Sequence, residues 1–215
     1  GKRFYGPNAW PTALPQFKAS MLELFDGWRG LAGNISRLFA MSLGLPTEFF
    51  VERAVKPLCQ MRVVKYPPQG RVPVTTGIGC GEHTDYSVVS LIWQLDRPGL
   101  QLMNRDGRWV NAPSIPGTFV CPIGDTTARY TNDYWSATLH RVVNGDDGIR
   151  HSAAFFYDLD ADTVIEPLPK FVTPERPAQH ERTTMGEHVA RGFDGTFAYR
   201  RKEQNLSEQM PQENA

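Results

Sequence analysis

Gly81-Glu82-His83-Thr84-Asp85-Tyr86 precedes the apolar run Ser87-Val88-Val89-Ser90-Leu91-Ile92-Trp93, and these two segments set the interpretation of the whole chain. Side chains alternate between faces of an extended strand, so His83 and Asp85 point the same way. An imidazole and a carboxylate are two of the three ligands of the facial triad that holds non-haem Fe(II). His140 is the candidate for the third ligand. A His-x-Asp pair is common by chance, so a polar strand end at the rim of a sheet is the competing interpretation of the pair alone.

The composition describes one globular domain without a nucleic-acid or membrane partner. The chain has 215 residues, 23 basic and 23 acidic side chains, and 40% hydrophobic residues, enough for a full core. Its one concentrated basic run, Arg200-Arg201-Lys202, is too short for a phosphate-binding surface. We expect neither a membrane span nor a signal peptide. Three scattered cysteines without a Cys-x-x-Cys motif argue against disulfides and thiolate zinc, so we expect a reducing, cytoplasmic location.

A helical region precedes a strand-rich one. Apolar side chains at helical spacing predict a helix from about Pro15 to Leu43, stopped by Gly44-Leu45-Pro46. A short second helix is expected to begin with Thr47 as its N-cap. From Met61 onward, short β-type runs between Gly, Pro, Asn and Asp predict an antiparallel sandwich or barrel. The expected strands are 61–66, 87–93, 100–104, 109–112, 118–123, 138–143 and 150–158.

Turn and capping residues divide the rest of the chain. Asn104-Arg105-Asp106-Gly107 and Thr131-Asn132-Asp133 supply residues for hairpin turns. A last helix is predicted from about Thr183 to Phe197, with Thr184 and Glu187 at capping-box spacing. The tail after it is too polar to remain ordered. We therefore expect a helical brace over 1–60, the remainder of a longer N-terminal region, then a β core over 61–170, a C-terminal loop and helix over 171–202, and a mobile tail over 203–215.

Arg150 and Ser152 begin an apolar strand ten residues after His140. Alternation places them on one face with Ala154 and Phe156. A guanidinium forks onto both oxygens of a carboxylate, and the serine hydroxyl adds a third donor, so the pair suits one end of a dicarboxylate. An exposed Arg and Ser at a strand edge is the alternative for the pair alone.

These motifs together resemble a known family. Val64-Lys65-Tyr66-Pro67-Pro68, His83-x-Asp85, Leu139-His140-Arg141-Val142 and Arg150-x-Ser152 stand in the order and spacing of the iron(II)- and 2-oxoglutarate-dependent dioxygenases of the isopenicillin N synthase-like family. The resemblance includes Gly99-Leu100-Gln101-Leu102 and Ile123-Gly124-Asp125, and extends from about Tyr66 to Pro169. It implies a mainly β fold with flanking helices: a double-stranded β-helix, or jelly roll, braced by a long N-terminal-side helix and a C-terminal helix.

The resemblance also implies the metal and the reaction. His83, Asp85 and His140 would bind Fe(II) and leave positions open for cosubstrate and O2. O2 would drive decarboxylation of 2-oxoglutarate to succinate and CO2, coupled to hydroxylation, desaturation or ring formation on a small organic molecule. An iron-dependent oxidase of the isopenicillin N synthase or aminocyclopropane carboxylate oxidase type, which does not use 2-oxoglutarate, and a non-catalytic jelly-roll binding protein are the rival functions. The oligomeric state is left open.

The remaining site residues follow from the same resemblance. Arg150, Ser152 and Tyr66 would bind the distal carboxylate of 2-oxoglutarate, although Tyr66 could also be a buried structural tyrosine. Phe156 falls where the family often has a substrate-facing aromatic residue, and a plain core ring is the alternative. The apolar wall near Phe156 favours a compact, mostly hydrophobic natural product or secondary metabolite as substrate.

Several positions depart from the family pattern or carry no assigned chemistry. Val64 stands where many plant members have asparagine, and Asp133 replaces a common turn glycine, where Asp tolerates left-handed geometry. The usual N-terminal segment, which helps to close the pocket in relatives, is expected to be missing. For His151, His180 and His188 we expect ordinary surface or core roles.

Overall fold

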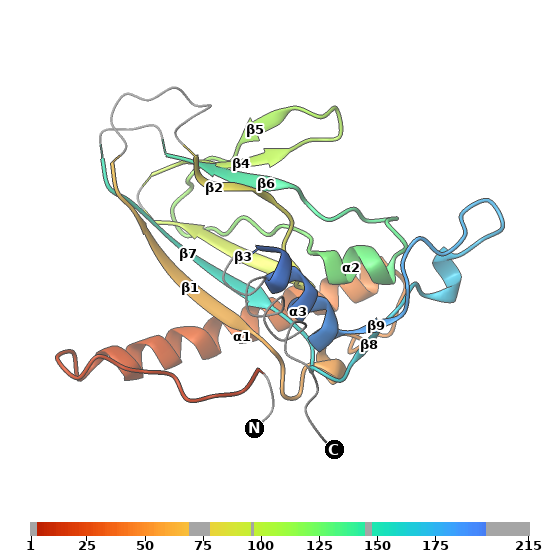
Figure 1. The fold of residues 1–215 in the computed structure, drawn as a ribbon, viewed down its shortest axis with the longest axis horizontal. Helices are drawn as coiled ribbons and strands as arrows, with labels where there is room; N and C mark the ends of the chain where they lie inside the picture. The colour runs from red at the N-terminus through yellow and green to blue at the C-terminus, as the bar shows by residue number, and fades with distance from the viewer. Residues whose placement is uncertain (1–3, 69–77, 96, 145–147, 197–215) are drawn as a thin grey trace, which may run out of the picture.

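The computed structural model describes residues 4–68, 78–95, 97–144 and 148–196. Two antiparallel sheets lie one above the other, and a long helix runs along the outer side of the lower sheet (Figure 1). The predicted tail over 203–215 lies outside the described residues. Among the residues that are described, every helix falls short of the length and apolarity that a membrane crossing demands.

The chain passes back and forth between the two sheets. The first sheet contains, in spatial order, β1 (Gln60–Tyr66), β7 (Arg150–Tyr157) and β3 (Val89–Gln94). The second contains β2 (Ile78–His83), β6 (His140–Val143), β4 (Leu100–Met103) and β5 (Trp109–Asn111). Consecutive strands from β1 to β4 therefore alternate between sheets, which is the connectivity of a jelly roll. The expected mainly β architecture is confirmed.

The register of β7 determines what faces the inside. Gln60 on β1 and Ser90 on β3 both lie opposite Phe156, and Tyr66 lies opposite Arg150. Directly opposed residues share a face of the sheet. The inner face, toward the second sheet, thus carries Gln60, Arg62, Val64 and Tyr66 from β1, Arg150, Ser152, Ala154 and Phe156 from β7, and Ser90, Ile92 and Gln94 from β3.

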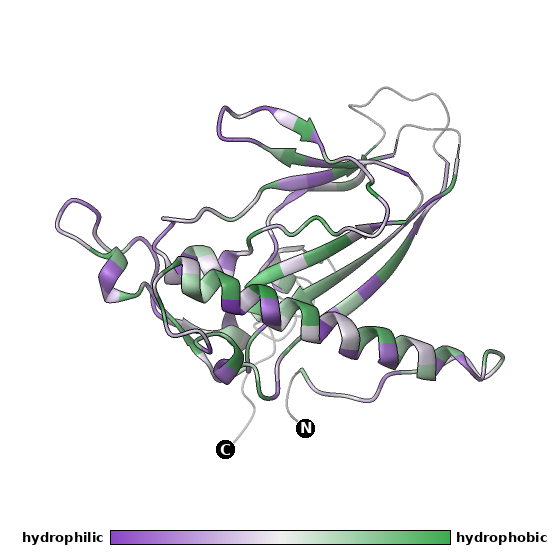
Figure 2. Ribbon diagram, turned by 180° about the vertical axis from the view of Figure 1, so that it is seen from behind, coloured by the Kyte–Doolittle hydropathy of each residue, from purple (hydrophilic) through white to green (hydrophobic). Residues whose placement is uncertain are grey.

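The outer face of the same sheet packs against α1 (Phe17–Ser42), which crosses it in Figure 2. The Phe155 ring is fully buried and meets the Phe25 ring edge-on at 5.1 Å. Trp28 from α1 meets Phe119 in the same way at 5.0 Å. This cluster is the larger hydrophobic core, and it holds the helix predicted as a brace. Beyond Ser42, Gly44 takes a positive φ of 61°, which ends the helix where the sequence predicted.

A smaller core lies between the two sheets. Ile92 and Ala154 from the first sheet pack with Leu100 and Val142 from the second. Tyr66 and Cys80 border this cluster. It joins the two sheets near the middle of the inner row, between the end that carries Arg150 and the end that carries Phe156.

Three local predictions are wrong. The turn after Gly44 leads into a short 3-10 helix, η1 (Val51–Arg53), whose N-cap is Phe50 and not Thr47. Residues 118–123 form isolated bridges to β3 and no strand of their own, because only Val120 and Ile123 pair. Thr131-Asn132-Asp133 terminates a helix and does not connect a hairpin. Asp133 does adopt the left-handed conformation expected of it, with φ at 60°.

The C-terminal part ends in a capped helix. The two-stranded sheet of β8 (Val164–Ile165) and β9 (Thr183–Thr184) and the 3-10 helix η2 (Pro169–Phe171) precede α3 (Met185–Thr196). The Thr184 hydroxyl accepts from the Glu187 amide at 3.3 Å, and the Glu187 carboxylate accepts from the Thr184 amide at 3.0 Å. This reciprocal pair confirms the predicted capping box.

Truncating Phe155 should reveal how much the brace contributes to stability. Phe155→Ala removes a fully buried ring from the contact with Phe25, so we expect the free energy of unfolding to fall by about 3–5 kcal/mol. Leu38→Ala is the control. Leu38 lies on α1 and is 60% exposed, so its truncation should change the free energy of unfolding by less than about 0.5 kcal/mol. Urea denaturation measures both. Equal effects of the two substitutions would contradict this view of the core.

Candidate metal centre and active site

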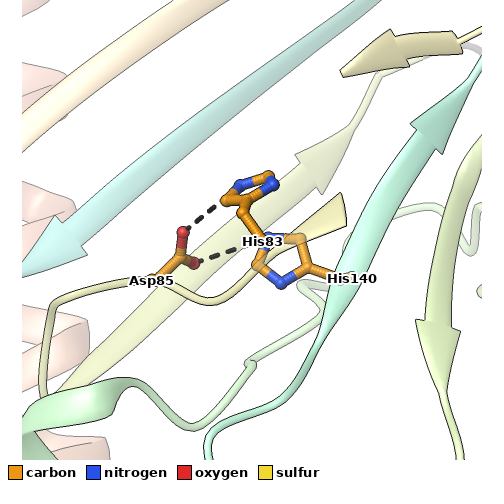
Figure 3. Close-up of side chains that lie close together, drawn as sticks. All are labelled: His83, Asp85 and His140. Atoms are coloured by element: carbon orange, nitrogen blue, oxygen red, sulfur yellow. Dashed lines mark ion pairs between the residues drawn. The ribbon is translucent and has the colours of Figure 1, made fainter. Parts of the chain in front are cut away.

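The three predicted ligands meet at one point between the sheets (Figure 3). His83 is the last residue of β2 and lies opposite His140, the first residue of β6. Asp85 reaches them from the loop after β2, with its two oxygens 3.7 Å from the His83 Nε2 and 3.7 Å from the His140 Nε2. The candidate ligand atoms all lie within 4.8 Å of one another. The side chains therefore converge as the sequence predicted, although Asp85 does so from a loop and not from a strand.

The backbone orients both imidazole rings. The Nδ1 of His83 lies 2.8 Å from the Gly81 carbonyl oxygen, and that of His140 lies 2.9 Å from the Thr138 carbonyl oxygen. A carbonyl only accepts, so each Nδ1 carries a proton, and in the neutral ring each Nε2 presents its lone pair toward the centre. Metal-binding histidines are commonly held in this way.

Serine hydroxyls hold the Asp85 carboxylate in place. The Ser90 hydroxyl donates to its Oδ2 at 2.5 Å, and Ser87 lies 3.0 Å from Ser90. The carboxylate is only 4% exposed, so these serines provide the polar surroundings that burial would otherwise remove. Ser90 lies on the inner face of β3 in the first sheet. It therefore points toward the metal site, whose histidines come from the second sheet.

The loop that carries Asp85 rests on α2 (Asp125–Tyr130), a helix that the sequence analysis missed. The Asp125 amide donates to the Asp85 carbonyl oxygen at 2.7 Å. The hydroxyls of Thr126 and Thr127 donate to the carbonyl oxygens of Tyr86 and Val88 at 2.7 Å and 2.8 Å. Each of these three loop carbonyls is thereby satisfied by a helix residue, which fixes the loop without a strand ladder.

The two histidines differ in their electrostatic surroundings. The Cys80 side chain, 3.8 Å from Nδ1, raises the pKa of His83 to about 9. Burial lowers the pKa of His140, because the charged imidazolium loses hydration. Their ring centroids are 4.3 Å apart, so two protonated rings would repel each other strongly. A divalent cation competes with these protons, and binding of metal to such a site weakens as the pH falls.

A cavity of about 320 Å³ opens beside His83 and Asp85. Phe156 lines it, so the ring faces the site and is not enclosed in the larger core. The guanidinium of Arg62 lies over this ring, 5.5 Å from its centroid. Asp158, just past the end of β7, also lines the cavity and is only 3% exposed. The other lining residues are Gln60, Cys80, Gly81, Glu82, Thr84, Tyr86, Ser87, Val189 and Phe193.

Arg150, Ser152 and Tyr66 gather at the opposite end of the inner face. The Arg150 side chain is 2% exposed and lies over the Tyr66 ring at 4.9 Å. Its Nη2 donates to the Gln94 Oε1 at 3.2 Å. Ser152 is 6% exposed. Because Arg150 and Ser152 are buried inside the sandwich, the alternative of an exposed Arg and Ser at a strand edge is wrong. Neither residue belongs to the lining of the cavity beside the metal ligands.

Gly99 allows this packing around Arg150. Its φ is 153°, a conformation that other residues rarely adopt. A Cβ atom there would lie 2.9 Å from the Arg150 Nε and 2.8 Å from the Val143 carbonyl oxygen. The glycine in the family-like Gly99-Leu100-Gln101-Leu102 motif therefore has a physical reason.

The other histidines have the ordinary surroundings that we expected. The His180 Nε2 lies within hydrogen-bonding distance of the Asp133 carboxylate, at 2.8 Å. His188 packs its ring edge-on against Tyr86 at 5.7 Å, and burial lowers its pKa to about 4. His151 is half-buried on β7 and alternates with the inner-face residues. None of the three belongs to the cluster of candidate metal ligands found among the described residues.

Two histidines and one carboxylate around a point inside a jelly roll define a non-haem iron protein of the oxygenase class. Comparisons with known proteins agree. Residues 57–159 match the model of the 2OG-Fe(II) oxygenase superfamily. The chain belongs to this superfamily, which the isopenicillin N synthase-like resemblance fits.

Individual relatives extend the likeness beyond the matched core. The chain is 41% identical over 196 residues to a homoarginine-6-hydroxylase from Glycine max, a match that covers 88% of this chain and 59% of that protein. The crystal structure of a full-length Neurospora crassa protein in complex with alpha-KG and thymine superposes with a TM-score of 0.80, at 28% identity, covering 89% of this chain and 61% of that one. The structure of JOX2 in complex with 2OG, Fe and JA gives 0.73 at 27% identity, covering 83% and 53%. The chain thus spans less than two thirds of the length of these relatives.

The buried Asp158 carboxyl should make stability depend on pH. Burial, and secondarily the charge of Asp85, raises its pKa to about 8, against about 3.9 in an unfolded chain. Between these values the unfolded state binds fewer protons, so this group lowers the free energy of unfolding as the pH rises. Asp158→Asn removes the titration. Relative to the unchanged protein, the variant should gain stability progressively from about pH 4 to about pH 8. Urea unfolding of the metal-free proteins across this range measures it, and a pH-independent difference would contradict the assignment.

Proposed function

We propose that this protein is an Fe(II)- and 2-oxoglutarate-dependent oxygenase that oxidises a small organic molecule, releasing succinate and CO2. The observation that carries the proposal is the convergence of His83, Asp85 and His140, with both Nδ1 atoms bound to backbone carbonyls and both Nε2 atoms turned inward. Superfamily membership gives the same reaction class. The cytoplasm remains the proposed location.

The residues fit the metal. Two neutral imidazoles and one carboxylate are the donor set of non-haem Fe(II) oxygenases, and they occupy one side of the metal only. His83, Asp85 and His140 would hold the ion. When bound, Fe(II) supplies the site at which O2 is activated. The chain itself keeps the imidazoles in the required tautomer, and Ser90 and α2 keep the carboxylate in place.

The cosubstrate site is proposed at Arg150, Ser152 and Tyr66. A guanidinium and two hydroxyls provide the donors for the distal carboxylate of 2-oxoglutarate. Gln94 and Gly99 act on Arg150, the first by accepting one of its N–H groups and the second by leaving room for it. Burial strengthens the attraction for a carboxylate, since a buried guanidinium is poorly solvated.

The substrate is proposed to bind in the cavity beside His83 and Asp85, against Phe156. The related Glycine max protein is a homoarginine-6-hydroxylase, and the Neurospora crassa structure contains thymine. Proteins similar to this chain thus bind or act on small molecules of quite different chemistry. A compact natural product with a largely apolar body, as the sequence predicted, is compatible with the aromatic part of the cavity. Hydroxylation, desaturation and ring formation remain alternative outcomes.

The division of the chain is retained as part of the proposal. Residues 61–170 form the oxygenase core, 1–60 brace it, and 171–202 add a loop and helix. Two observations support this division: α1 packs on the outer face of the first sheet, and Val189 and Phe193 of α3 line the cavity.

Removing Asp85 tests the metal site. Asp85→Ala should abolish retention of Fe(II) after desalting and reduce succinate formation to background, because two imidazoles alone hold Fe(II) weakly. Far-ultraviolet circular dichroism should remain unchanged. Asp106→Ala, in the exposed β4–β5 turn, is the matched control and should retain iron and turnover. Full activity of the Asp85→Ala variant would exclude the assignment.

Removing Arg150 tests the cosubstrate site. Arg150→Ala should raise the 2-oxoglutarate concentration needed for half-maximal turnover roughly 10- to 100-fold, since a charge-assisted hydrogen bond contributes about 1.5–3 kcal/mol. Arg150→Lys should restore part of the loss, because lysine keeps the charge but lacks the planar fork. Arg105→Ala, in the exposed turn, is the control. An unchanged 2-oxoglutarate dependence in both Arg150 variants would favour the iron-dependent oxidase instead.

A further inference from the structure

The inner row of β7 continues past the strand to a residue that the proposed reaction does not use. Alternate positions run from Arg150 through Ser152 and Ala154 to Phe156, and the next position of the row is Asp158. Phe156 and Asp158 both line the cavity, so the alternation persists beyond the last paired residue. One row therefore has a cation at one end and a carboxylate at the other, about 26 Å apart at roughly 3.3 Å per residue.

Among the described residues, the Asp158 side chain has no hydrogen-bond partner that would explain its burial. Its side chain is 3% exposed, and its Oδ1 is buried without a hydrogen-bond partner among the described residues. The main-chain oxygen of the same residue accepts from the Cys59 thiol at 3.8 Å, so it is the side chain alone that lacks a partner. A buried carboxylate without a donor is costly, and such groups are usually paired or bind a ligand.

The residues around Asp158 select among possible ligands. The charge of the Asp85 carboxylate acts on it, and this charge disfavours an anionic ligand beside it. Glu82 adds another carboxylate to the cavity lining. Among the described residues, Arg62 is the only arginine or lysine in that lining, its guanidinium lies over the Phe156 ring, and no ion pair joins it to Asp158. A ligand group that is both cationic and rich in N–H donors suits these surroundings best.

We propose that Asp158 recognises a positively charged nitrogen group of the substrate, a guanidinium or a primary amine, whose apolar stem lies along Phe156 toward the metal. This proposal rests on the proposed function and adds the substrate class to it. The aromatic rings of Phe156 and Phe193 and the side chain of Val189 contact the stem, while the Asp158 carboxylate accepts from the nitrogen group. A cation beside Asp158 also favours its ionised form and offsets the cost of burial. The anionic cosubstrate and the cationic substrate thus take opposite ends of one strand.

Two probes of similar shape, one a cation and one neutral, test this recognition. Hexylguanidinium and hexylurea have similar shapes, but only the first is a cation. Their binding is measured by isothermal titration calorimetry on the protein loaded with Fe(II) and 2-oxoglutarate in the absence of O2. We expect the unchanged protein to bind hexylguanidinium at least tenfold more tightly, and Asp158→Asn to reduce this preference to less than about twofold, because the neutral amide attracts the cation far less.

Matched variants separate recognition from general damage. Asp160→Asn changes the same residue type two positions later, where Asp160 accepts from the Lys56 amide outside the cavity lining, and it should retain the full preference. Arg62→Gln should retain it too, because Arg62 is not the partner of Asp158. Loss of the preference in the Arg62 variant would show that the discrimination between the probes does not come from the Asp158 carboxylate, and it would overturn the proposal.

The unchanged protein provides a test that does not depend on how the variants fold. Equal affinity for the two probes, or binding of neither, would overturn the recognition of a cation. Failure of the proposed function has a different signature, since it would appear as absent Fe(II) retention and absent succinate formation. Either conclusion can therefore be reached without the other.

Discussion

The antiparallel register of β7 between β1 and β3 is the constraint on which the rest of the structure depends. Because side chains alternate, the register sends Phe155 outward to α1 and Phe156 inward to the cavity. A shift of one residue would exchange the two faces and bury the polar row against the helix. The burial of apolar rings against α1 thus fixes the strand that carries the proposed carboxylate-binding residues, and stability and function share one structural element.

The metal site depends on a second and more local constraint. Asp85 lies outside any strand, so no ladder of hydrogen bonds holds its backbone, and α2 takes over this task through Asp125, Thr126 and Thr127. Gly124 permits the close approach, because a Cβ atom there would lie 2.0 Å from the Ser87 carbonyl oxygen. The family-like Ile123-Gly124-Asp125 motif is explained by this contact. Its function is to position the loop that carries Asp85.

The sequence predicted most of this arrangement, and its failures have physical causes. Periodicity identified α1, and alternation on 150–158 identified the inner row, because both patterns are local. It missed β2, whose Ile78-Gly79-Cys80-Gly81-Glu82 lacks alternating apolar residues, and α2, which is too short and too rich in threonine to show helical periodicity. Hydrogen bonds to distant residues stabilise both.

The site residues that were missed needed the strand register. Ser90 and Gln94 are ordinary polar residues in a mostly apolar run, and only their positions opposite Phe156 and Ser152 turn them toward the site. Asp158 is the last residue of the strand predicted over 150–158, and the alternation that places Phe156 on the inner face places the Asp158 carboxylate there too. The metal ligands could be identified earlier because a resemblance to a family supplies long-range information that periodicity lacks.

The inner row also explains why Ala154 has the smallest side chain among its neighbours. It lies between the proposed cosubstrate anchor at Ser152 and the substrate-facing Phe156, opposite Ile92. A dicarboxylate that contacts both Arg150 and the metal must pass over this position, so a larger side chain would occupy its path. Ile92 and Val142 keep the surroundings apolar, which limits water where charges of cosubstrate and metal meet. With the proposed cosubstrate and substrate sites, the order of cation, hydroxyl, small, aromatic and acidic side chains along β7 would follow from three requirements: one end would hold an anion, the middle would leave room for the dicarboxylate, and the far end would face the substrate.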